Sequence, residues 1–237
     1  MAETKIEWAD RVWNPVVGCT PVSEGCAHCY AKRIYERFHQ GRKFSEVSTI
    51  PGRLEEPLHW KKPSRVFVNS MSDLFHPDVS FDYILRVWVN MAKATNQTFL
   101  ILTKRPDRMK LFVNDWLPGA FGVGTGTWKT LNKPLPNVWL GVSIESQKRA
   151  DKRISLLLET PAAVRFVSLE PMLWPVDISG YLGSLYILGD VPEHTFYEPG
   201  LDWVICGGET GPGARPMHPD WVRSLRDQCQ SAGVPFF

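Results

Sequence analysis

Residues 97–103, "QTFLILT", form a nearly unbroken apolar run that leads directly into the polar sequence "KRP" at residues 104–106. A strand with one face in water would instead alternate apolar and polar residues. A continuous run of this length is typical of a strand that is covered on both faces, as strands are in parallel α/β sheets. The sequence around it should therefore repeat a pattern of strand and helix.

Short apolar runs do alternate with helix-like stretches along most of the chain. Strands are predicted over residues 11–17, 65–70, 97–103, 137–143, 163–169 and 201–208. Helices are predicted over residues 30–40, 80–95, 105–117, 146–160 and 218–233, and a further strand starts at the final "VPFF". This alternation predicts parallel βαβ units. About six units fit an α/β fold of the partial (β/α)6 TIM-like barrel type, with a cysteine-rich loop after its first strand.

Three of the predicted helices carry local signals. Ile34 and Phe38 lie four residues apart, on one face of the first helix. Ser80 can cap the first turn of the second helix, which has an apolar stripe. The last helix has Pro219 near its start and Gly233 at its end, which is the usual asymmetry of these two residues.

The composition indicates one large core. The chain has 237 residues, of which 43% are hydrophobic, and its net charge of +2 shows no strong basic field over the whole surface. No segment approaches the roughly 20 apolar residues of a membrane span, and the N-terminus lacks the pattern of a secretory signal. We therefore expect a single domain over residues 1–237, a cytoplasmic location and no membrane partner. Residues 118–136 and 174–200 are expected to be loop insertions, and an end inside a strand suggests a truncated C-terminus.

Three of the five cysteines lie in the stretch "GCTPVSEGCAHCY", where Cys19, Cys26 and Cys29 have the spacing C-x6-C-x2-C. In a cytoplasmic protein such a group indicates a metal site or catalysis rather than disulfides. A structural zinc site is closed by four nitrogen or sulfur ligands. Neither His28, between two cysteines, nor His39, on the following helix, is well placed to be the fourth. An iron–sulfur cluster with three protein thiolates and one open iron fits better.

Three cysteines in one loop after the first strand of a (β/α) barrel resemble the radical S-adenosylmethionine enzymes, whose commonest spacing is C-x3-C-x2-C. The resemblance implies that the cysteines ligate a [4Fe-4S] cluster. It also implies that the amino and carboxylate groups of S-adenosylmethionine (SAM) chelate the remaining iron. Reduction of the cluster by an external electron donor would then cleave the sulfonium and give a 5′-deoxyadenosyl radical.

A narrower resemblance covers nearly the whole chain. The motifs "WNPVVGCTPVSEGCAHCYA", "SLEPML" and "VICGGETGPGARPMHPDWV" are similar to those of phage- and prophage-associated proteins of a three-cysteine-motif type. The motifs "LTK" and "GVSIES" are more distantly similar to spore photoproduct lyase, which repairs a thymine dimer. These resemblances imply a nucleobase, nucleotide or nucleic acid as substrate, while a peptide or a small metabolite stays open.

Polar residues and glycines follow the predicted strands, where parallel α/β folds bind their ligands. The residues expected to bind the cofactor are Asn69, Ser70, Asp73, Lys104, Ser143, Glu145, Glu170, Gly207 and Gly208. Lys104 would pair with a bound carboxylate, a role that the resemblance to the lyase also implies. Glu170 suits a ribose hydroxyl or an amine, and the two glycines would let the backbone approach a ligand. The polar residues after the second strand equally suit ordinary loop capping.

Several charged and sulfur-bearing residues have competing interpretations. Lys104 and Arg105 could both be solvated surface cations. Arg153 is a second candidate for binding the carboxylate, although its helix position is more typical of a surface residue. Cys206, at a strand end, is a weak candidate for a catalytic hydrogen donor and is more typical of core packing.

Two other functions stay open. A zinc-stabilised nucleic-acid-binding module would use the same cysteines without catalysis. Alternatively, a degenerate barrel would keep an iron–sulfur cluster only for stability. The basic stretch "YAKRIYERFHQGRK" at residues 30–43 and the ten tryptophans suit contacts to phosphates and bases, but an exposed helix and core packing explain them equally well.

Overall fold

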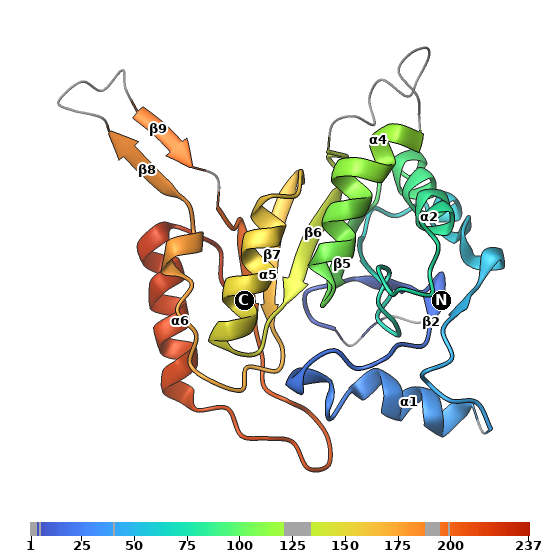
Figure 1. Cartoon of the computed structure of the whole chain (residues 1–237), viewed down its shortest axis with the longest axis horizontal. Coiled ribbons are helices and arrows are strands. Elements are labelled where there is room, and N and C mark those ends of the chain that lie inside the picture. Colours follow the sequence, from blue (N-terminus) through green and yellow to red (C-terminus); the bar gives the residue numbers. More distant parts are fainter. Residues whose placement is uncertain (1–3, 5, 40, 121–133, 188–194, 199) are drawn as a thin grey trace.

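The computed structural model describes residues 4, 6–39, 41–120, 134–187, 195–198 and 200–237. These residues form a mixed α/β fold around a sheet of six parallel strands (Figure 1). In spatial order the strands are β1 (Arg11–Trp13), β4 (Arg65–Val68), β5 (Thr98–Thr103), β6 (Val138–Ser143), β7 (Val164–Leu169) and β10 (Trp203–Cys206). The main-sheet strands follow one another in space in the same order as along the chain, and all neighbours are parallel, as in the predicted βαβ units.

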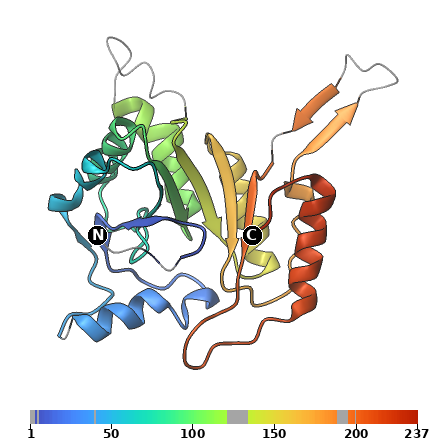
Figure 2. The same ribbon diagram turned by 180° about the vertical axis from the view of Figure 1, so that it is seen from behind.

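The predicted helices are also present. They are α1 (Tyr30–Phe38), α2 (Phe81–Lys93), α3 (Pro106–Lys110), α4 (Leu117–Ala120), α5 (Gln147–Leu158) and α6 (Pro219–Ala232), with a π-helical stretch, Leu111–Trp116, joining α3 to α4. The connection from β7 to β10 instead contains a 3-10 turn, Ser179–Tyr181, and a ribbon of two strands, β8 (Ser184–Ile187) and β9 (Thr195–Glu198). In Figures 1 and 2 this ribbon projects from the body of the molecule.

The first predicted strand, over residues 11–17, is wrong as a single element. It ends at Trp13, and a second short strand, β2 (Val16–Val17), pairs antiparallel with β3 (Ser48–Thr49) outside the main sheet. Pro15 stands between the two strands and has no N–H to donate to a neighbouring strand. The chain therefore turns away from the sheet before it reaches the cysteines.

The local signals of α2 and α6 are confirmed, whereas Ile34 and Phe38 of α1 are exposed, and that helix buries Ala31 and Tyr35 instead. The Ser80 hydroxyl accepts a hydrogen bond from the backbone N–H of Tyr83 at 3.3 Å and so caps α2. Pro219 is the first residue of α6, and Gly233 ends that helix with φ at 69°. A side chain at this left-handed position would be strained, which explains the glycine.

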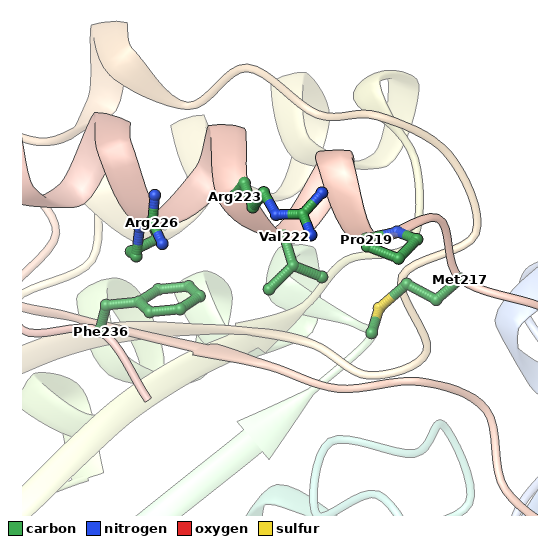
Figure 3. Close-up of a pocket in the computed structure, with 6 residues that line it drawn as sticks. All are labelled: Met217, Pro219, Val222, Arg223, Arg226 and Phe236. Atoms are coloured by element: carbon green, nitrogen blue, oxygen red, sulfur yellow. The ribbon is translucent and has the colours of Figure 1, made fainter.

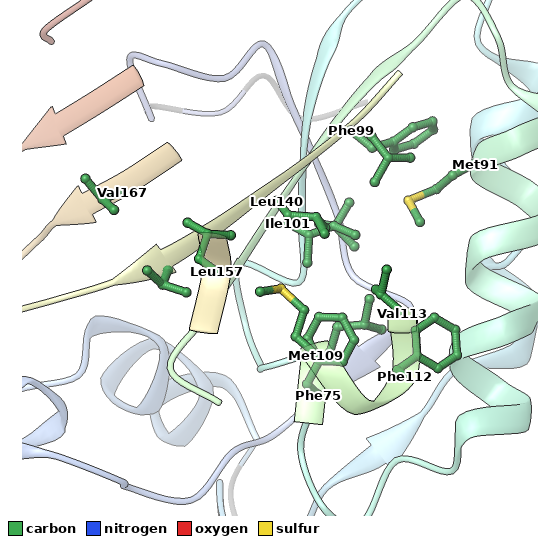
Figure 4. Packing of buried hydrophobic residues seen from close by; sticks show 14 of the residues in the cluster. Phe75, Met91, Phe99, Ile101, Met109, Phe112, Val113, Leu140, Leu157 and Val167 are labelled. Atoms are coloured by element: carbon green, nitrogen blue, oxygen red, sulfur yellow. The ribbon is translucent and has the colours of Figure 1, made fainter. Parts of the chain in front are cut away.

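One face of the sheet packs against the helices and forms the main core; we call it the helix-covered face. Figure 4 shows Ile101, Leu140 and Val167, from three adjacent strands, beside Met109 and Leu157 from the helical layer. All five side chains are fully buried. Burial of apolar surface on this face is the main source of the fold's stability.

The opposite face, here called the inner face, is covered by the N-terminal segment. The Trp8 ring lies 4.7 Å from that of Phe67 and 6.5 Å from that of Trp203, measured between ring centroids. On β6, a Cβ added at Gly141 would lie only 2.5 Å from the ring of Phe166, so this glycine makes room for the ring. Aromatic side chains thus fill the inner face toward the amino ends of the strands.

The six strands form an open sheet, since no pairing within the described residues joins β1 to β10. Beyond β10, Phe236 makes a parallel bridge with Val204, which confirms that a strand-like segment begins in the final "VPFF". Most of the predicted insertion at 118–136 lies outside the described residues, as does part of the one at 174–200. None of the described helices is both long and apolar enough to cross a membrane.

Candidate functional site

Residues 18–30, here called the cysteine loop, connect β2 to α1. In Figures 1 and 2, α1 lies beneath the central sheet, at the end toward which strand β6 runs. The sequence Gly18–Tyr30 thus brings its three thiols to the side of the molecule where the parallel strands end. Ligands of parallel α/β folds bind at this edge.

Cys19, Cys26 and Cys29 are free thiols, and all three are half-buried. Among the described residues, no group of three or more His, Cys, Asp or Glu side chains is placed to hold one metal ion. An iron–sulfur cluster makes a different demand, because each thiolate binds its own iron and the sulfurs need not converge on one point.

The two histidines near the cysteines are placed apart from them. The His28 side chain is exposed and packs beside Gly213. The His39 ring stacks on Tyr35, with 4.3 Å between the ring centroids, and its Nδ1 lies 3.1 Å from the Tyr35 carbonyl oxygen. The structure therefore gives neither histidine the position of a fourth ligand.

Cys19 contacts a buried cation. The Arg105 Nη1 lies 3.5 Å from Cys19 Sγ and 3.0 Å from Asp73 Oδ2, and its Nη2 donates to the Thr20 carbonyl at 2.8 Å. The expectation that Arg105 is a solvated surface cation is wrong, because only 7% of the residue is exposed. Its hydrogen bonds and the Asp73 charge compensate for the lost water. Burial and, after it, the Asp73 charge raise the pKa of Cys19 to about 11, although Arg105 opposes both.

Asp73 uses both of its carboxylate oxygens within the protein. Its Oδ1 accepts hydrogen bonds from the Thr103 hydroxyl at 2.7 Å and from the Phe75 N–H at 3.0 Å. Its Oδ2 accepts from the Lys104 N–H at 3.2 Å as well as from Arg105. Asp73 thus ties the segment after β4 to the end of β5, which favours a positioning role over the expected contact with a cofactor.

Lys104 and Ser143, which the sequence predicted as cofactor ligands, lie together. The Lys104 ammonium donates a hydrogen bond to the Ser143 hydroxyl at 2.8 Å. Side chains alternate along a strand, so both residues share the inner face with Leu100 and Leu102 of β5. Ser143 is 3% exposed, whereas Lys104 is only half-buried. Lys104 is therefore the more accessible residue of this pair.

Glu145 is completely buried beside two arginines. Arg153 Nη1 lies 2.9 Å from Glu145 Oε2 and also donates to the Ser143 carbonyl. The interpretation of Arg153 as a surface residue is wrong, since it is 3% exposed and the Glu145 charge compensates for its burial. The other oxygen, Oε1, accepts no hydrogen bond within the described residues, although Arg149 Nε lies 3.8 Å away.

The middle of the cysteine loop is fixed to the end of β6 and the start of α5. A Cβ added at Gly25 would lie 3.2 Å from Glu145 Cδ, so the loop backbone passes directly over this carboxylate. The neighbouring Glu24 accepts hydrogen bonds from Arg149 Nη2 at 2.9 Å and from the Ser146 hydroxyl at 3.0 Å. The hydrogen bonds from Arg149 lower the pKa of Glu24 to about 2.

The segment after β10 closes over the loop from the other side. Arg215 Nη2 donates to the Glu24 carbonyl at 3.0 Å, and the same guanidinium pairs with the Glu209 carboxylate. Hydrogen bonds from Arg215 lower the pKa of Glu209 to about 2. At Gly211, where φ is 96°, a Cβ would collide with the guanidinium of Arg33 on α1. Gly211 and Gly213 of "GGETGPG" thus permit close packing onto α1 and the cysteine loop.

Glu170 lies on the inner face after β7. Its Oε2 accepts hydrogen bonds from the Ser168 hydroxyl at 2.8 Å and from Trp8 Nε1 at 3.3 Å. A Cβ at Gly207 would lie 2.8 Å from Glu170 Oε1, so this glycine makes room for the carboxylate. Gly208 is exposed. Of the two glycines, Gly208 therefore has the more open backbone.

The turn after β4 also meets the cysteine loop. Asn69 has a left-handed backbone, with φ at 62°. Its Oδ1 accepts a hydrogen bond from the Val16 N–H at 3.2 Å, whereas its buried Nδ2 has no hydrogen-bond partner within the described residues. The Ser70 hydroxyl donates to Asn14 Oδ1 at 3.2 Å, and its carbonyl accepts from the Tyr30 hydroxyl at 2.7 Å. The loop is thus hydrogen-bonded to the segment that follows β4.

Cys206 points to the helix-covered face. Its Sγ lies 3.7 Å from the Met172 sulfur, and burial raises the pKa of its thiol to about 12. Its neighbours along β10, Val204 on the same face and Ile205 on the inner face, follow the alternation of a strand. This position suits packing better than hydrogen donation at the inner face.

A separate open cleft of about 380 Å³ lies between α6 and the last residues of the chain (Figure 3). It is lined by Met217, Pro219, Val222, Arg223, Arg226 and Phe236. None of the predicted site residues lines it.

Sequence reasoning did not identify several residues of the site. Ser168 had a usable signal, because it stands two residues before Glu170 and therefore on the same face of the chain. The pairing of Glu209 with Arg215 and the contact of Arg105 with Cys19 had none, since they depend on where loops meet in space.

The match to a family model spans nearly the entire chain and gives no activity. Neither a curated protein nor a solved structure is significantly similar to this chain. The family model is described as "Protein of unknown function (DUF5131)" and matches residues 3–237, so the chain belongs to this family.

Proposed function

We propose that this protein is a radical SAM enzyme in which Cys19, Cys26 and Cys29 ligate a [4Fe-4S] cluster. The observation that carries the proposal is the position of the cysteine loop, which contacts the segments after β4, β5, β6 and β10 at the ligand-binding edge of a parallel sheet. Six parallel strands in chain order are consistent with a partial (β/α)6 TIM-like barrel, which we propose as the fold type.

The residues of the site fit such a cluster. Three half-buried free thiols supply the sulfur ligands that iron–sulfur clusters use. Ion pairs and hydrogen bonds at Glu24 and Arg105 hold the loop from both sides. With SAM on its open iron, the cluster would pass one electron from an external donor to the sulfonium, whose C–S bond would break to give methionine and a 5′-deoxyadenosyl radical.

The inner face supplies groups for the cofactor. Lys104 is a half-buried residue, and its ammonium group, beside Ser143, is the group we propose to bind the carboxylate of SAM. The Glu170 carboxylate, oriented by Ser168, would accept a hydrogen bond from a ribose hydroxyl. The exposed backbone at Gly208 would allow close approach of the adenine.

The surface of α1 favours a nucleic acid as the substrate class. Tyr30 and Phe38 are 40% and 71% exposed, and each is available for stacking on a base. Lys32, Arg33 and Arg37 stand on the same helix, where they would attract phosphates. Because α1 begins directly after Cys29, a nucleic-acid strand bound to α1 would lie next to the proposed cluster.

Anaerobic reconstitution with iron and sulfide tests the cluster. We expect about four irons per wild-type chain, a paramagnetic resonance spectrum after reduction, and a change in that spectrum when SAM is added. Cys19→Ala, Cys26→Ala and Cys29→Ala should each lose the cluster, whereas Cys206→Ala, the matched control outside the loop, should keep it. Stoichiometric zinc without iron and sulfide would instead support the nucleic-acid-binding module.

Lys104→Ala tests the cofactor site separately. Its iron content should equal that of the wild type, while its affinity for SAM should fall, because the carboxylate loses its cation. An unchanged affinity would contradict the role of Lys104. A bound cluster that neither responds to SAM nor cleaves it would support a purely stabilising cluster.

A further inference from the structure

Arg105 is held rigidly between the cysteine loop and the ends of two strands. Its guanidinium is buried and donates to Cys19 Sγ at 3.5 Å, to Asp73 Oδ2 at 3.0 Å and to the Thr20 carbonyl and hydroxyl at 2.8 and 3.2 Å. An ion pair with Asp73 alone would not place the Arg105 guanidinium against the Cys19 sulfur. The contact with the sulfur therefore indicates a role for Arg105 in addition to neutralising Asp73.

The partners of Arg105 are themselves fixed. Asp73 is held by the Thr103 hydroxyl, at 2.7 Å. The Thr20 hydroxyl lies 2.7 Å from His76 Nε2. Because His76 Nδ1 accepts a hydrogen bond from the Asp78 N–H, the ring proton is on Nε2 and is donated to Thr20. The positive group beside Cys19 is therefore preorganised, and little rearrangement is needed when the charge near it changes.

We propose that Arg105 is a positioning residue that raises the reduction potential of the cluster through its hydrogen bond to the Cys19 sulfur; this inference rests on the function proposed above. One-electron reduction adds a negative charge to the cluster and its thiolates. A cation that donates a hydrogen bond to a ligating sulfur stabilises the reduced state more than the oxidised one. Without Arg105, the same external donor would reduce a smaller fraction of the protein.

Two substitutions test this role. Arg105→Gln removes the charge and, because its side chain is two atoms shorter, also the hydrogen bond to the Cys19 sulfur, whereas Arg105→Lys keeps the charge and its pairing with Asp73. Arg108→Gln is the matched control, because Arg108 stands one turn away and donates to the carbonyls of Pro77 and Val79 instead of a thiol. For each reconstituted protein, iron content and midpoint potential are measured, the latter by a redox titration followed by paramagnetic resonance.

In Arg105→Gln we expect the iron content of the wild type and a reduction equilibrium about tenfold less favourable, which is about 59 mV for one electron. Arg105→Lys should recover part of this loss, and Arg108→Gln should match the wild type. A wild-type potential in Arg105→Gln, or an equal shift in Arg108→Gln, would overturn the proposal. If Arg105→Gln loses its iron, the potential of Arg105→Lys tests the proposal instead. A lowered potential in Arg105→Lys would support the proposal. A wild-type potential in Arg105→Lys, or loss of iron in that variant too, would assign Arg105 a purely structural role. A wild-type protein that binds no cluster would refute the proposed function itself.

Discussion

Strand β7 shows how the two faces of the sheet differ. Val167 and Leu169 point to the helix-covered face, where they join the apolar core. Phe166, Ser168 and Glu170 alternate with them on the inner face, which changes from aromatic to polar toward the carboxyl end of the strand. One strand thus contributes to the core on one side and to the candidate site on the other. Neighbouring substitutions should therefore affect stability and cofactor binding separately.

The largest loss of stability is expected on the helix-covered face, for Phe112→Ala. Phe112 is fully buried, and its ring contacts those of Phe75, Phe81, Trp88 and Trp116. Removing it leaves a cavity and should lower the free energy of unfolding by about 3–5 kcal/mol, measured by urea denaturation. Phe112→Leu, which refills most of the space, should lose clearly less. Equal losses for both variants would contradict a packing role for the ring.

The inner face should respond to added volume instead. A Cβ in Gly141→Ala would lie 2.5 Å from the Phe166 ring, so the free energy of unfolding should fall by about 1–3 kcal/mol. Adding Phe166→Leu in the same chain should recover part of this loss. Gly180→Ala is the control, because its new Cβ would meet no atom of the described residues within 4 Å. If both alanines had the same effect, the inner face would not be tightly packed.

The sequence predicted the elements of the sheet because their signals are local. The apolar run at 97–103 became β5, and two of the polar residues expected at the strand ends, Lys104 and Ser143, lie within hydrogen-bond distance of each other. The end of strand β1 before Pro15 was not predicted. Apolar residues continue on both sides of Pro15, but the hydrogen bonds to the main sheet do not. Periodicity reports which face a side chain occupies, but not where the chain leaves a sheet.

The electrostatics of the site could not be predicted in the same way. Arginine is usually found at the surface, yet Arg105 and Arg153 are both buried. Each is paired with a carboxylate from another segment, which compensates for the burial of its charge. Asp73 lies 32 positions before Arg105, and Glu145 lies on the loop before α5. Pairing over such separations depends on the tertiary fold and has no local pattern.

A smaller effect is expected where the cysteine loop is attached to the sheet. The pKa of Glu24 is about 2 in the folded protein, below its ordinary value of 4.5. Its contribution to stability is therefore complete above pH 4.5 and is lost as the pH falls through about 2. Glu209 shows the same shift, so both ion pairs weaken in this window.

Glu24→Gln should thus lower the free energy of unfolding at neutral pH by about 1 kcal/mol, since the pair with Arg149 is partly exposed. The variant should also lose less stability than the wild type as the pH falls below 4.5, which urea denaturation at a series of pH values would measure. Glu36→Gln, whose partner Lys32 is 3.9 Å away on an exposed face, is the control. Parallel curves for Glu24→Gln and the wild type would show that the pair does not anchor the loop.

The smallest effect on stability is expected on the exposed side of α1. Phe38 is 71% exposed, so Phe38→Ser should change the free energy of unfolding by less than about 0.5 kcal/mol. If α1 binds a nucleic acid, the same substitution should weaken binding of a labelled single-stranded oligonucleotide by about 1–3 kcal/mol, measured by fluorescence anisotropy. Leu111→Ser, at a 49% exposed position on a different helical segment, should leave that affinity unchanged. Equal affinities for the two variants would remove α1 from the substrate-binding surface, even if the cysteine loop holds its cluster as proposed.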